Sequence, residues 1–600
     1  MRQVIYDLFV GLPLSFFLAI CILYAPALAL FPRLLHRPFY FSLIPVLSYF
    51  LIGCLSYIFI VCGLFRHDVV LTVSLVLFVV ALCRGYLSMR SRQSAWQSAD
   101  WKILAFNAIF LIPMILLALF SAFSINDALG SWNHWAKLAY FSLPDVQHMY
   151  PTFYPHFLAY AYQFLGSLQP EGIVKVLLVF FIFSILNVIA FFSTKTKDSF
   201  LRYVVVLLLI IFPGNEFFSL GMYHFYAYGY ADPLLAATVV TSGAAMMFYC
   251  THHEDSLLLI IAIAAAIASA WTKQPGLLWA AFVIPAILVT KMLIQKKIKF
   301  REMLSIIVVL SAVLFWLLGP GRHFYQNQGV IGASLGARHS FVETFFYAIK
   351  KYFIEQPTLL LIFILGFCAA AKSYCTRIIA AGMVVGLILW FTFASYDVRE
   401  GLYLIGLTGL LIAYADFFAE KTTRIVFFEK LQRVCAANSL RLLYVFAILM
   451  LLVGTLVSLV EVNKVKEHIY PFNGACTTLC RYFYEQPDWV YQTLYQDDAT
   501  IVAGTSVYEK SLFLGKKPVI MIDSADPKAI LAKLSANKVE FVMAVPANAP
   551  DYYEGLRTIA DKCPEYLQQL SLGKTRADYV IFKFNANARN KCQLDKPSNE

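Results

Sequence analysis

Four polar clusters interrupt an otherwise apolar sequence, and each contains an ionisable residue beside a predicted membrane span. Two of these residues are acidic, Asp127 and Asp232, and two are basic, Lys273 and Arg399. Ionisable groups at membrane depth are costly, so they mark functional sites by default. An arginine suits bidentate binding of phosphate, and a lysine at this depth needs an anionic partner. A lipid phosphate or one of the two carboxylates could be that partner.

Each of the four residues also has a simpler structural explanation. Asp127 could cap a helix at the end of a span, and Asp232-Pro233 has the pattern of an N-cap followed by proline. Lys273 could extend its ammonium group to the membrane surface. Arg399 has acidic neighbours and could form a local ion pair. The four gain weight as a set, because the topology derived below places all of them on one membrane face.

Aromatic and polar side chains accompany these clusters. Such residues can pack on sugar rings, although aromatic rings also anchor proteins at the membrane interface. The candidate acceptor- or sugar-binding residues are Trp132, His134, Trp135, Lys137, Tyr154, His156 and Tyr230.

The composition is that of a membrane protein. Of the 600 residues, 60% are hydrophobic and 14% are charged, whereas a soluble domain averages about 25% charged residues. The mean hydropathy is +0.69. Backbone groups in lipid must pair internally, so apolar runs of about 20 residues predict helices. We predict about fourteen spans, at 8–30, 41–65, 69–88, 103–123, 173–193, 202–220, 232–250, 257–272, 276–292, 303–319, 357–371, 378–394, 402–419 and 441–460.

Loops rich in Lys and Arg alternate with loops that are poor in them. The positive-inside rule places the rich loops, such as 291–301 and 421–441, in the cytoplasm. The opposite face then carries both termini, the long loops 124–172 and 320–356, and everything after residue 460. The net charge of +12 belongs mainly to the short loops, so it reports topology and does not indicate a nucleic-acid partner.

Beyond Val460 the pattern becomes that of a soluble domain. Strands alternate with helices, which predicts a small α/β domain with a mainly parallel sheet. If this domain is extracytoplasmic, its four cysteines can be paired. The predicted strands are 500–503, 519–522, 539–545 and an edge strand at 578–584. The predicted helices are 507–514, 527–536 and 552–570, the last with an interruption at Pro564. The cysteines are Cys476, Cys480, Cys563 and Cys592.

The four clusters, in this order, resemble the GT-C superfamily of membrane glycosyltransferases. The similarity is to bacterial relatives of the protein O-mannosyltransferases and of the lipid A aminoarabinose transferase. Asp127 matches the family's acidic residue in the first long outer loop, and Asp232 matches one that opens a later span. Thr272-Lys273-Gln-Pro-Gly276-Leu277 resembles a turn between two core spans, and Arg399 matches an arginine of the last outer loops.

The resemblance implies three parts: additional N-terminal transmembrane helices at 1–102, a GT-C-like transmembrane catalytic core at 103–460, and a periplasmic α/β domain at 461–600. The sequence departs from the family at two positions. Asp127 is followed by Ala, so the paired carboxylates of metal-using members are missing. A divalent cation, Mg or Mn, is therefore possible but not required by the pattern. Arg399 is followed by Glu-Gly-Leu, where many members carry Arg-Tyr.

The mechanism that the resemblance implies is transfer of a sugar from a polyprenyl-phosphate donor. Lys273 and Arg399 bind the phosphate, Asp127 is the general base on the acceptor, and Asp232 positions the acceptor or assists the base. A single displacement inverts the anomeric centre. The acceptor is a glycolipid, a polysaccharide or a protein, and the location is the bacterial inner membrane, with the C-terminal domain in the periplasm.

Two other functions are consistent with parts of the sequence. An O-antigen polymerase or ligase also spans the membrane many times, and such enzymes rely on Arg and His in a large outer loop. Arg322, Arg338 and His339 in loop 320–356 keep this alternative open. A lipid or sugar transporter predicts charges near the middle of the bilayer and repeated halves. The depth of Lys273 in the membrane discriminates transport from transfer at the surface.

Overall fold

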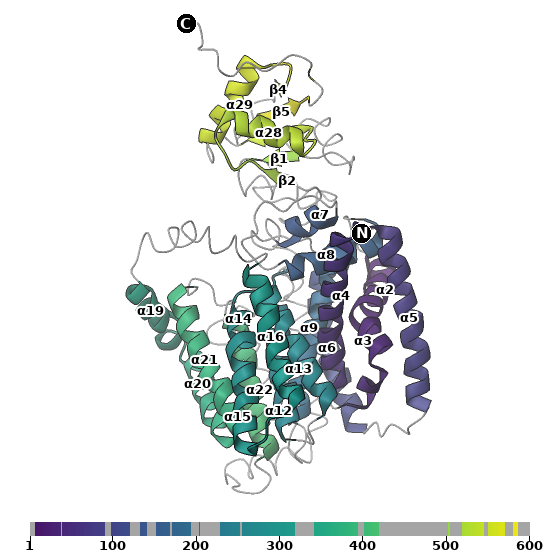
Figure 1. Cartoon of the computed structure of the whole chain (residues 1–600), viewed down its shortest axis with the longest axis vertical. Helices are drawn as coiled ribbons and strands as arrows, with labels where there is room; N and C mark the ends of the chain where they lie inside the picture. The colour runs from purple at the N-terminus through teal and green to yellow at the C-terminus, as the bar shows by residue number, and fades with distance from the viewer. Residues whose placement is uncertain are drawn as a thin grey trace.

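In this computed structural model, the described residues are 7–37, 39–90, 98–120, 132–140, 152–167, 171–193, 203, 229–251, 255–318, 341–393, 401–418, 502–504, 519–544, 550–570, 580–585 and 588. A helical bundle comprises nearly all of those before residue 419, and a small α/β domain comprises those after residue 501 (Figure 1).

The first half of the bundle begins with a span that changes helix type along its length. Two π-helical stretches lie within the span Leu8–Leu30, around α2 and α3. Two short helices, α7 and α8, lie between the long helices α6 and α9. The bounds are α2 Leu12–Ala19, α3 Ala25–Leu30, α4 Tyr40–Val61, α5 His67–Arg90, α6 Ser98–Phe120, α7 His134–Tyr140, α8 Phe153–Leu165 and α9 Glu171–Ser193.

The second half of the bundle contains the helices that carry Asp232 and Lys273. Asp232 is the first residue of α12, and Lys273 follows the last residue of α13. The bounds are α12 Asp232–Thr251, α13 Ser256–Thr272, α14 Pro275–Leu278, α15 Ile284–Gln295, α16 Phe300–Leu318, α19 Phe341–Ile349, α20 Pro357–Ala369, α21 Tyr374–Phe393 and α22 Leu402–Phe418.

Within the described part of the chain, 8 helices are long and apolar enough to cross a membrane, or up to 9 if one bent pair is a single span. That pair, Val342–Ile354 and Pro357–Ala369, bends by 92° at its break. Pro357 explains the break, because the residue before a proline disfavours the helical conformation. Shorter apolar helices cover Leu104–Leu119, Ser256–Thr272 and Leu402–Tyr414. The predicted spans 202–220 and 441–460 lie outside the described residues, apart from Tyr203.

The helix α4 packs deep in the bundle, although it belongs to the segment expected to be additional to the core. It contacts α8, α9 and α13, and α12 in turn contacts α9, α13 and α22. The buried Tyr49 of α4 packs edge-on against Phe153 and Phe157 of α8 and Phe181 of α9. The division at residue 102 remains a prediction, but α4 is in direct contact with the helices around the site.

The α/β domain contains a five-stranded sheet in the order β2-β1-β3-β5-β4. The strands β1, β2 and β3 are parallel, whereas β5 runs antiparallel to both β3 and β4. The helix α28 (Pro527–Ala536) begins after Asp526, whose carboxylate accepts hydrogen bonds from the backbone N–H groups of Lys528 and Ala529. The strand bounds are β1 Val502–Gly504, β2 Val519–Met521, β3 Phe541–Ala544, β4 Leu567–Leu570 and β5 Val580–Phe584.

Two sequence predictions for this domain were wrong. The helix predicted at 552–570 is α29 (Pro550–Lys562), and it ends before Pro564, which cannot continue a helix. The residues 567–570 instead form β4. As a result, β5 is not the predicted edge strand but lies between β3 and β4. The predicted helix at 507–514 lies outside the described residues.

One described cysteine differs from the others. Cys563, buried in the α/β domain, is disulfide-bonded. The described cysteines of the bundle are all free thiols: Cys21, Cys54, Cys62, Cys83, Cys250, Cys368 and Cys375. The pairing predicted for the cysteines of the soluble domain is thus confirmed for Cys563.

Candidate functional site at one end of the bundle

A buried ion pair joins two of the four predicted site residues. The Lys273 Nζ lies 2.6 Å from the Asp232 Oδ1, and the two side chains are 6% and 2% exposed. The other carboxylate oxygen, Asp232 Oδ2, is buried and has no hydrogen-bond partner among the described residues. Asp232 therefore does not cap α12, and Lys273 does not extend into solvent. Both simpler explanations of these residues are excluded by this contact.

The sequence around Lys273 forces a sharp turn that presents its side chain inward. The Lys273 N–H donates to the Ser269 carbonyl at the end of α13, and the Gly276 N–H donates back to the Lys273 carbonyl. Pro275 then begins α14. A Cβ atom on Gly276 would collide with the backbone of Ser269 and Ala270. Glycine is therefore needed for the close approach of α14 to the end of α13.

Thr272, the residue before Lys273, forms a hydrogen bond with a side chain of the N-terminal helix α4. The buried hydroxyl of Tyr49 in α4 lies 2.7 Å from the Thr272 Oγ1. The Thr272 hydroxyl also donates to the Ala268 carbonyl of its own helix, at 2.6 Å. Because α4 is remote in sequence, no local pattern could identify this contact. Tyr49 is thus a supporting residue of the site that the sequence analysis did not name.

A second tyrosine holds the segment before Asp232. Gly229 adopts a positive φ of 91°, which a glycine takes without strain. Its carbonyl accepts a hydrogen bond from the buried Tyr154 hydroxyl at 2.7 Å. Tyr154 lies in α8, a helix of 13 residues that is not among the candidate membrane spans. Burial and, to a smaller degree, the nearby Tyr49 and Asp232 raise the pKa of the Tyr154 phenol well above its usual value, so it stays a neutral donor.

Three of the predicted sugar-binding aromatic residues, Trp132, Trp135 and Tyr154, form a buried cluster. Trp132 packs edge-on against Trp135, at 5.2 Å between ring centroids, and lies 5.6 Å from Tyr154. Trp132, Trp135, Tyr154 and Tyr230 are all buried. His156 is half-buried, with its ring 6.2 Å from that of Tyr57. The cluster thus connects α7, α8 and the segment leading to Asp232.

A second buried ion pair adjoins this aromatic cluster. The Lys137 Nζ lies 2.7 Å from the Glu171 Oε1, with side chains 0% and 1% exposed. The Asn133 amide donates to the same oxygen at 3.1 Å, and the Tyr162 hydroxyl donates to the Asn133 Oδ1 at 2.7 Å. Lys175, one turn further along α9, is also fully buried. Glu171 and Lys175 are one helical turn apart at the start of an otherwise apolar span, and this spacing is the sequence pattern that could have identified them.

Three predicted residues are not placed by the structure. Asp127 and Arg399 lie outside the described residues, and of His134 only the backbone, at the start of α7, is described. The roles given to them remain predictions. Among the residues that the structure does describe, no three His, Cys, Asp or Glu side chains come together as a metal site requires. The expected Mg or Mn ion stays a prediction.

Comparison with solved structures identifies the class of fold. The crystal structure of ArnT from Cupriavidus metallidurans bound to undecaprenyl phosphate matches with a TM-score of 0.50 at 14% identity, covering 84% of this chain and 100% of ArnT. Its apo structure matches with a TM-score of 0.49 at 13% identity, with the same coverage. An archaeal oligosaccharyltransferase, AglB from Archaeoglobus fulgidus, has a TM-score of 0.38 at 12% identity, covering 84% of this chain and 75% of AglB.

The sequence matches no known family profile and no curated protein. The fold is nevertheless that of a polytopic membrane protein with a small α/β domain. It is similar to the fold of ArnT, the solved structure that matches over 84% of this chain. The predicted fold class, an α-helical polytopic membrane protein with a C-terminal α/β domain, is thus confirmed.

Proposed function

We propose that this protein is an inverting glycosyltransferase that moves a sugar from a polyprenyl-phosphate donor to an extracytoplasmic acceptor. The observation that carries the proposal is the buried Lys273–Asp232 pair, set at the end of two helices in a fold similar to that of ArnT. A lysine there is suited to a phosphate, and the pair holds its ammonium in place without solvent. The acceptor is a glycolipid, a polysaccharide or a protein.

The proposed chemistry is one displacement at the anomeric carbon. Asp127 takes the proton from the acceptor hydroxyl or amine, and the freed lone pair attacks C1 of the sugar. The bond from C1 to the phosphate oxygen breaks, and its electron pair leaves on the polyprenyl phosphate. Lys273 and Arg399 neutralise the charge that develops on that phosphate. Attack on the face opposite the leaving group inverts the anomeric centre.

Asp232 has two tasks in this proposal. One carboxylate oxygen fixes the Lys273 ammonium at 2.6 Å. The other, Asp232 Oδ2, is buried without a hydrogen-bond partner in the part of the chain that the structure describes. A buried oxygen that accepts no hydrogen bond is unfavourable. An O–H or N–H group of the substrate could therefore donate a hydrogen bond to it. We assign Asp232 Oδ2 to a hydroxyl or amine of the acceptor, which it orients toward the base.

The position of the pair at the ends of two helices supports transfer over transport. Asp232 opens α12 and Lys273 follows the end of α13, so both lie at helix ends. A transporter predicts such charges near the middle of the bilayer. The alternative function, an O-antigen polymerase or ligase, depends on the loop 320–356. Residues 320–340 of this loop lie outside the described residues.

We place the site and the α/β domain on the periplasmic side of a bacterial inner membrane. The loops rich in Lys and Arg assign the opposite face to the cytoplasm. The disulfide at Cys563 supports this location, because structural disulfides persist mainly in oxidising compartments. The periplasm lacks activated nucleotide sugars, which is the reason for a lipid-linked donor.

The direct test is turnover of a panel of polyprenyl-phosphate sugars by the purified protein. We expect hydrolysis or transfer by the wild type, and loss with Asp127→Asn and with Lys273→Met. The matched control is Asp68→Asn, which removes an exposed carboxylate whose partner, Arg66, is also exposed. Full turnover by Asp127→Asn would remove that residue as the base. Equal loss in the Asp68 control would show that the assay reports folding and not chemistry.

A further inference from the structure

The turn between α15 and α16 lies near the C-terminal end of α12, whereas Asp232 lies at its N-terminal end. This turn combines lysines with exposed apolar side chains. Lys296, Lys297 and Lys299 lie within four residues of chain, and Ile298 and Phe300 are 80% and 73% exposed. In water such an exposed pair of large apolar residues would be unfavourable. At a membrane surface the apolar groups enter the boundary of the acyl chains while the lysines reach the headgroups.

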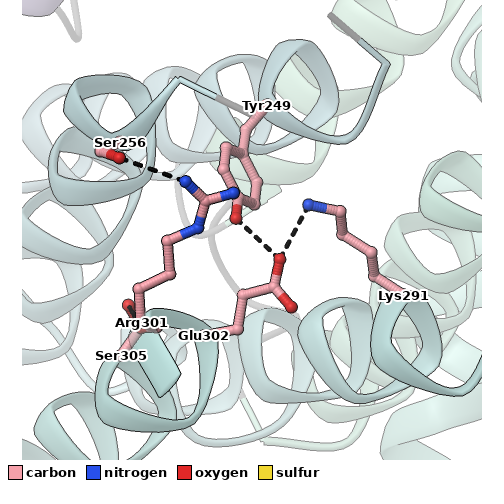
Figure 2. Close-up of polar contacts among 6 residues, drawn as sticks. All are labelled: Tyr249, Ser256, Lys291, Arg301, Glu302 and Ser305. Atoms are coloured by element: carbon pink, nitrogen blue, oxygen red, sulfur yellow. Dashed lines mark hydrogen bonds and ion pairs between the residues drawn. The ribbon is translucent and has the colours of Figure 1, made fainter. Parts of the chain in front are cut away.

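A buried ion pair fixes both sides of this turn (Figure 2). The Lys291 Nζ, near the end of α15, lies 2.8 Å from the Glu302 Oε1 in the first turn of α16, and the side chains are 1% and 0% exposed. The Tyr249 hydroxyl of α12 donates to the same oxygen at 2.7 Å, and the Lys291 ammonium lies 3.8 Å from the centre of the Tyr249 ring. The turn is thus anchored on α12.

The anchor separates two kinds of lysine. Lys291, which the sequence analysis assigned to a cytoplasmic loop, is instead inside α15 and neutralised by Glu302. Lys296 and Lys297 are exposed, and neither has an ion-pair partner among the described residues. The left-handed Lys296 closes α15, since its N–H and that of Lys297 donate to the carbonyls of Leu293 and Met292. These two hydrogen bonds therefore fix the backbone at Lys296 and Lys297.

We propose that this turn is a binding site for the headgroup of an anionic phospholipid in the cytoplasmic leaflet. Lys296 and Lys297 pair with the lipid phosphate, and Ile298 and Phe300 lie against its acyl chains. Anionic leaflets attract basic segments next to membrane helices. Here the Lys291–Glu302 anchor and the closed end of α15 order the turn in advance, so binding does not have to order the backbone. The site is separate from the transferase site and does not depend on the proposed reaction.

The test is lipid retention by the full chain. The protein is placed in phosphatidylcholine nanodiscs with rising fractions of phosphatidylglycerol, and native mass spectrometry counts the lipids that stay bound. The test variant is Lys296→Gln/Lys297→Gln. The matched control is Lys350→Gln/Lys351→Gln, which removes the same charge from the π-helical stretch Lys350–Ile354 between α19 and α20. A further variant, Ile298→Ser/Phe300→Ser, removes the apolar contacts and keeps the lysines.

We expect the wild type and the control to retain phosphatidylglycerol selectively, and the test variant to lose a bound phosphatidylglycerol. The serine variant should retain it less well. The unfolding midpoint should rise with phosphatidylglycerol in the wild type and rise less in the test variant. Equal loss in the control, or no preference over phosphatidylcholine in the wild type, would overturn the site. Equal stabilisation of the wild type by inorganic phosphate in phosphatidylcholine would assign it to free phosphate instead of lipid.

Discussion

Lys273 and Asp232 are 41 residues apart in the sequence, yet the Lys273 Nζ lies 2.6 Å from the Asp232 Oδ1 in a buried pair. The contact joins the end of α13 to the beginning of α12. Removing water strengthens the attraction between two charges, but it also makes each charge costly to leave alone. The pair is therefore both a fastening between two helices and a charged group held ready for a substrate.

The first prediction concerns the pairwise energy of this contact. Lys273→Met or Asp232→Leu alone leaves a buried charge without its partner, so we expect a loss of about 3–5 kcal/mol of stability for each. Combining the two should cost much less than the sum of the single changes, because no charge is then left unpaired. Unfolding of the detergent-purified protein, followed by intrinsic fluorescence, measures the three differences. Additive effects would mean that the two groups do not interact.

The second prediction tests whether Asp232 binds the acceptor substrate or only stabilises the contact between α12 and α13. Asp232→Asn keeps the shape of the side chain and a carbonyl oxygen that can accept a hydrogen bond from the Lys273 ammonium, so we expect it to lose less stability than Asp232→Leu. If Asp232 Oδ2 orients the acceptor, the variant should have a raised KM for the acceptor, with a smaller change in KM for the donor. Steady-state kinetics with each substrate varied in turn provides the measurement. Unchanged values for both substrates would leave Asp232 with a structural role only.

The third prediction concerns the support from α4. Tyr49→Phe deletes one hydroxyl and leaves the ring among Phe153, Phe157 and Phe181. The loss of a buried hydrogen bond to Thr272 should cost about 1 kcal/mol of stability. Turnover should fall further than this loss explains, because Thr272 immediately precedes Lys273. The control is Tyr160→Phe, which deletes a buried hydroxyl bonded to Ser74, away from Lys273. A similar fall in turnover in the control would contradict the role given to Tyr49.

The sequence predicted the helical membrane fold because apolar runs of sufficient length have few alternatives in lipid. It also identified Asp232 as one possible partner of Lys273, since a buried cation requires an anion. The Tyr49–Thr272 contact could not be predicted, because a single hydroxyl in an apolar helix has no pattern and its partner is distant in sequence. Glu171 was missed because an acidic residue at the start of a helix is also what the helix dipole favours.

The same limits explain the errors in the α/β domain. The pattern after Tyr552 is helical, and the effect of Pro564 was predicted as an interruption instead of an end. In the short strand β4 the buried Leu567 is followed by two exposed residues and a half-buried one, so the strand lacks the alternation that would reveal it in the sequence. The position of β5 depends on β4, so one missed strand also changed the predicted edge of the sheet.

A fourth prediction follows from the buried Glu302. Its Oε1 accepts hydrogen bonds from both the Lys291 ammonium and the Tyr249 hydroxyl. Its Oε2 is buried, and no described residue donates a hydrogen bond to it. Lys291→Met leaves this carboxylate inside the protein without its cation. We expect a loss of about 3–5 kcal/mol, measured as a lower unfolding midpoint of the full chain. Tyr249→Phe should cost only about 1 kcal/mol, because the ion pair remains.

The control for the fourth prediction is the double variant Lys291→Met/Glu302→Leu, in which both charges are replaced by apolar groups. Because no unpaired charge is left, this variant should be more stable than Lys291→Met alone. The Asp232–Lys273 pair lies at the opposite end of α12, 17 residues or about 26 Å along the helix from Tyr249. Turnover by the double variant should therefore stay close to that of the wild type once both are folded. A large loss of turnover in the folded double variant would show instead that the two ends of α12 are coupled.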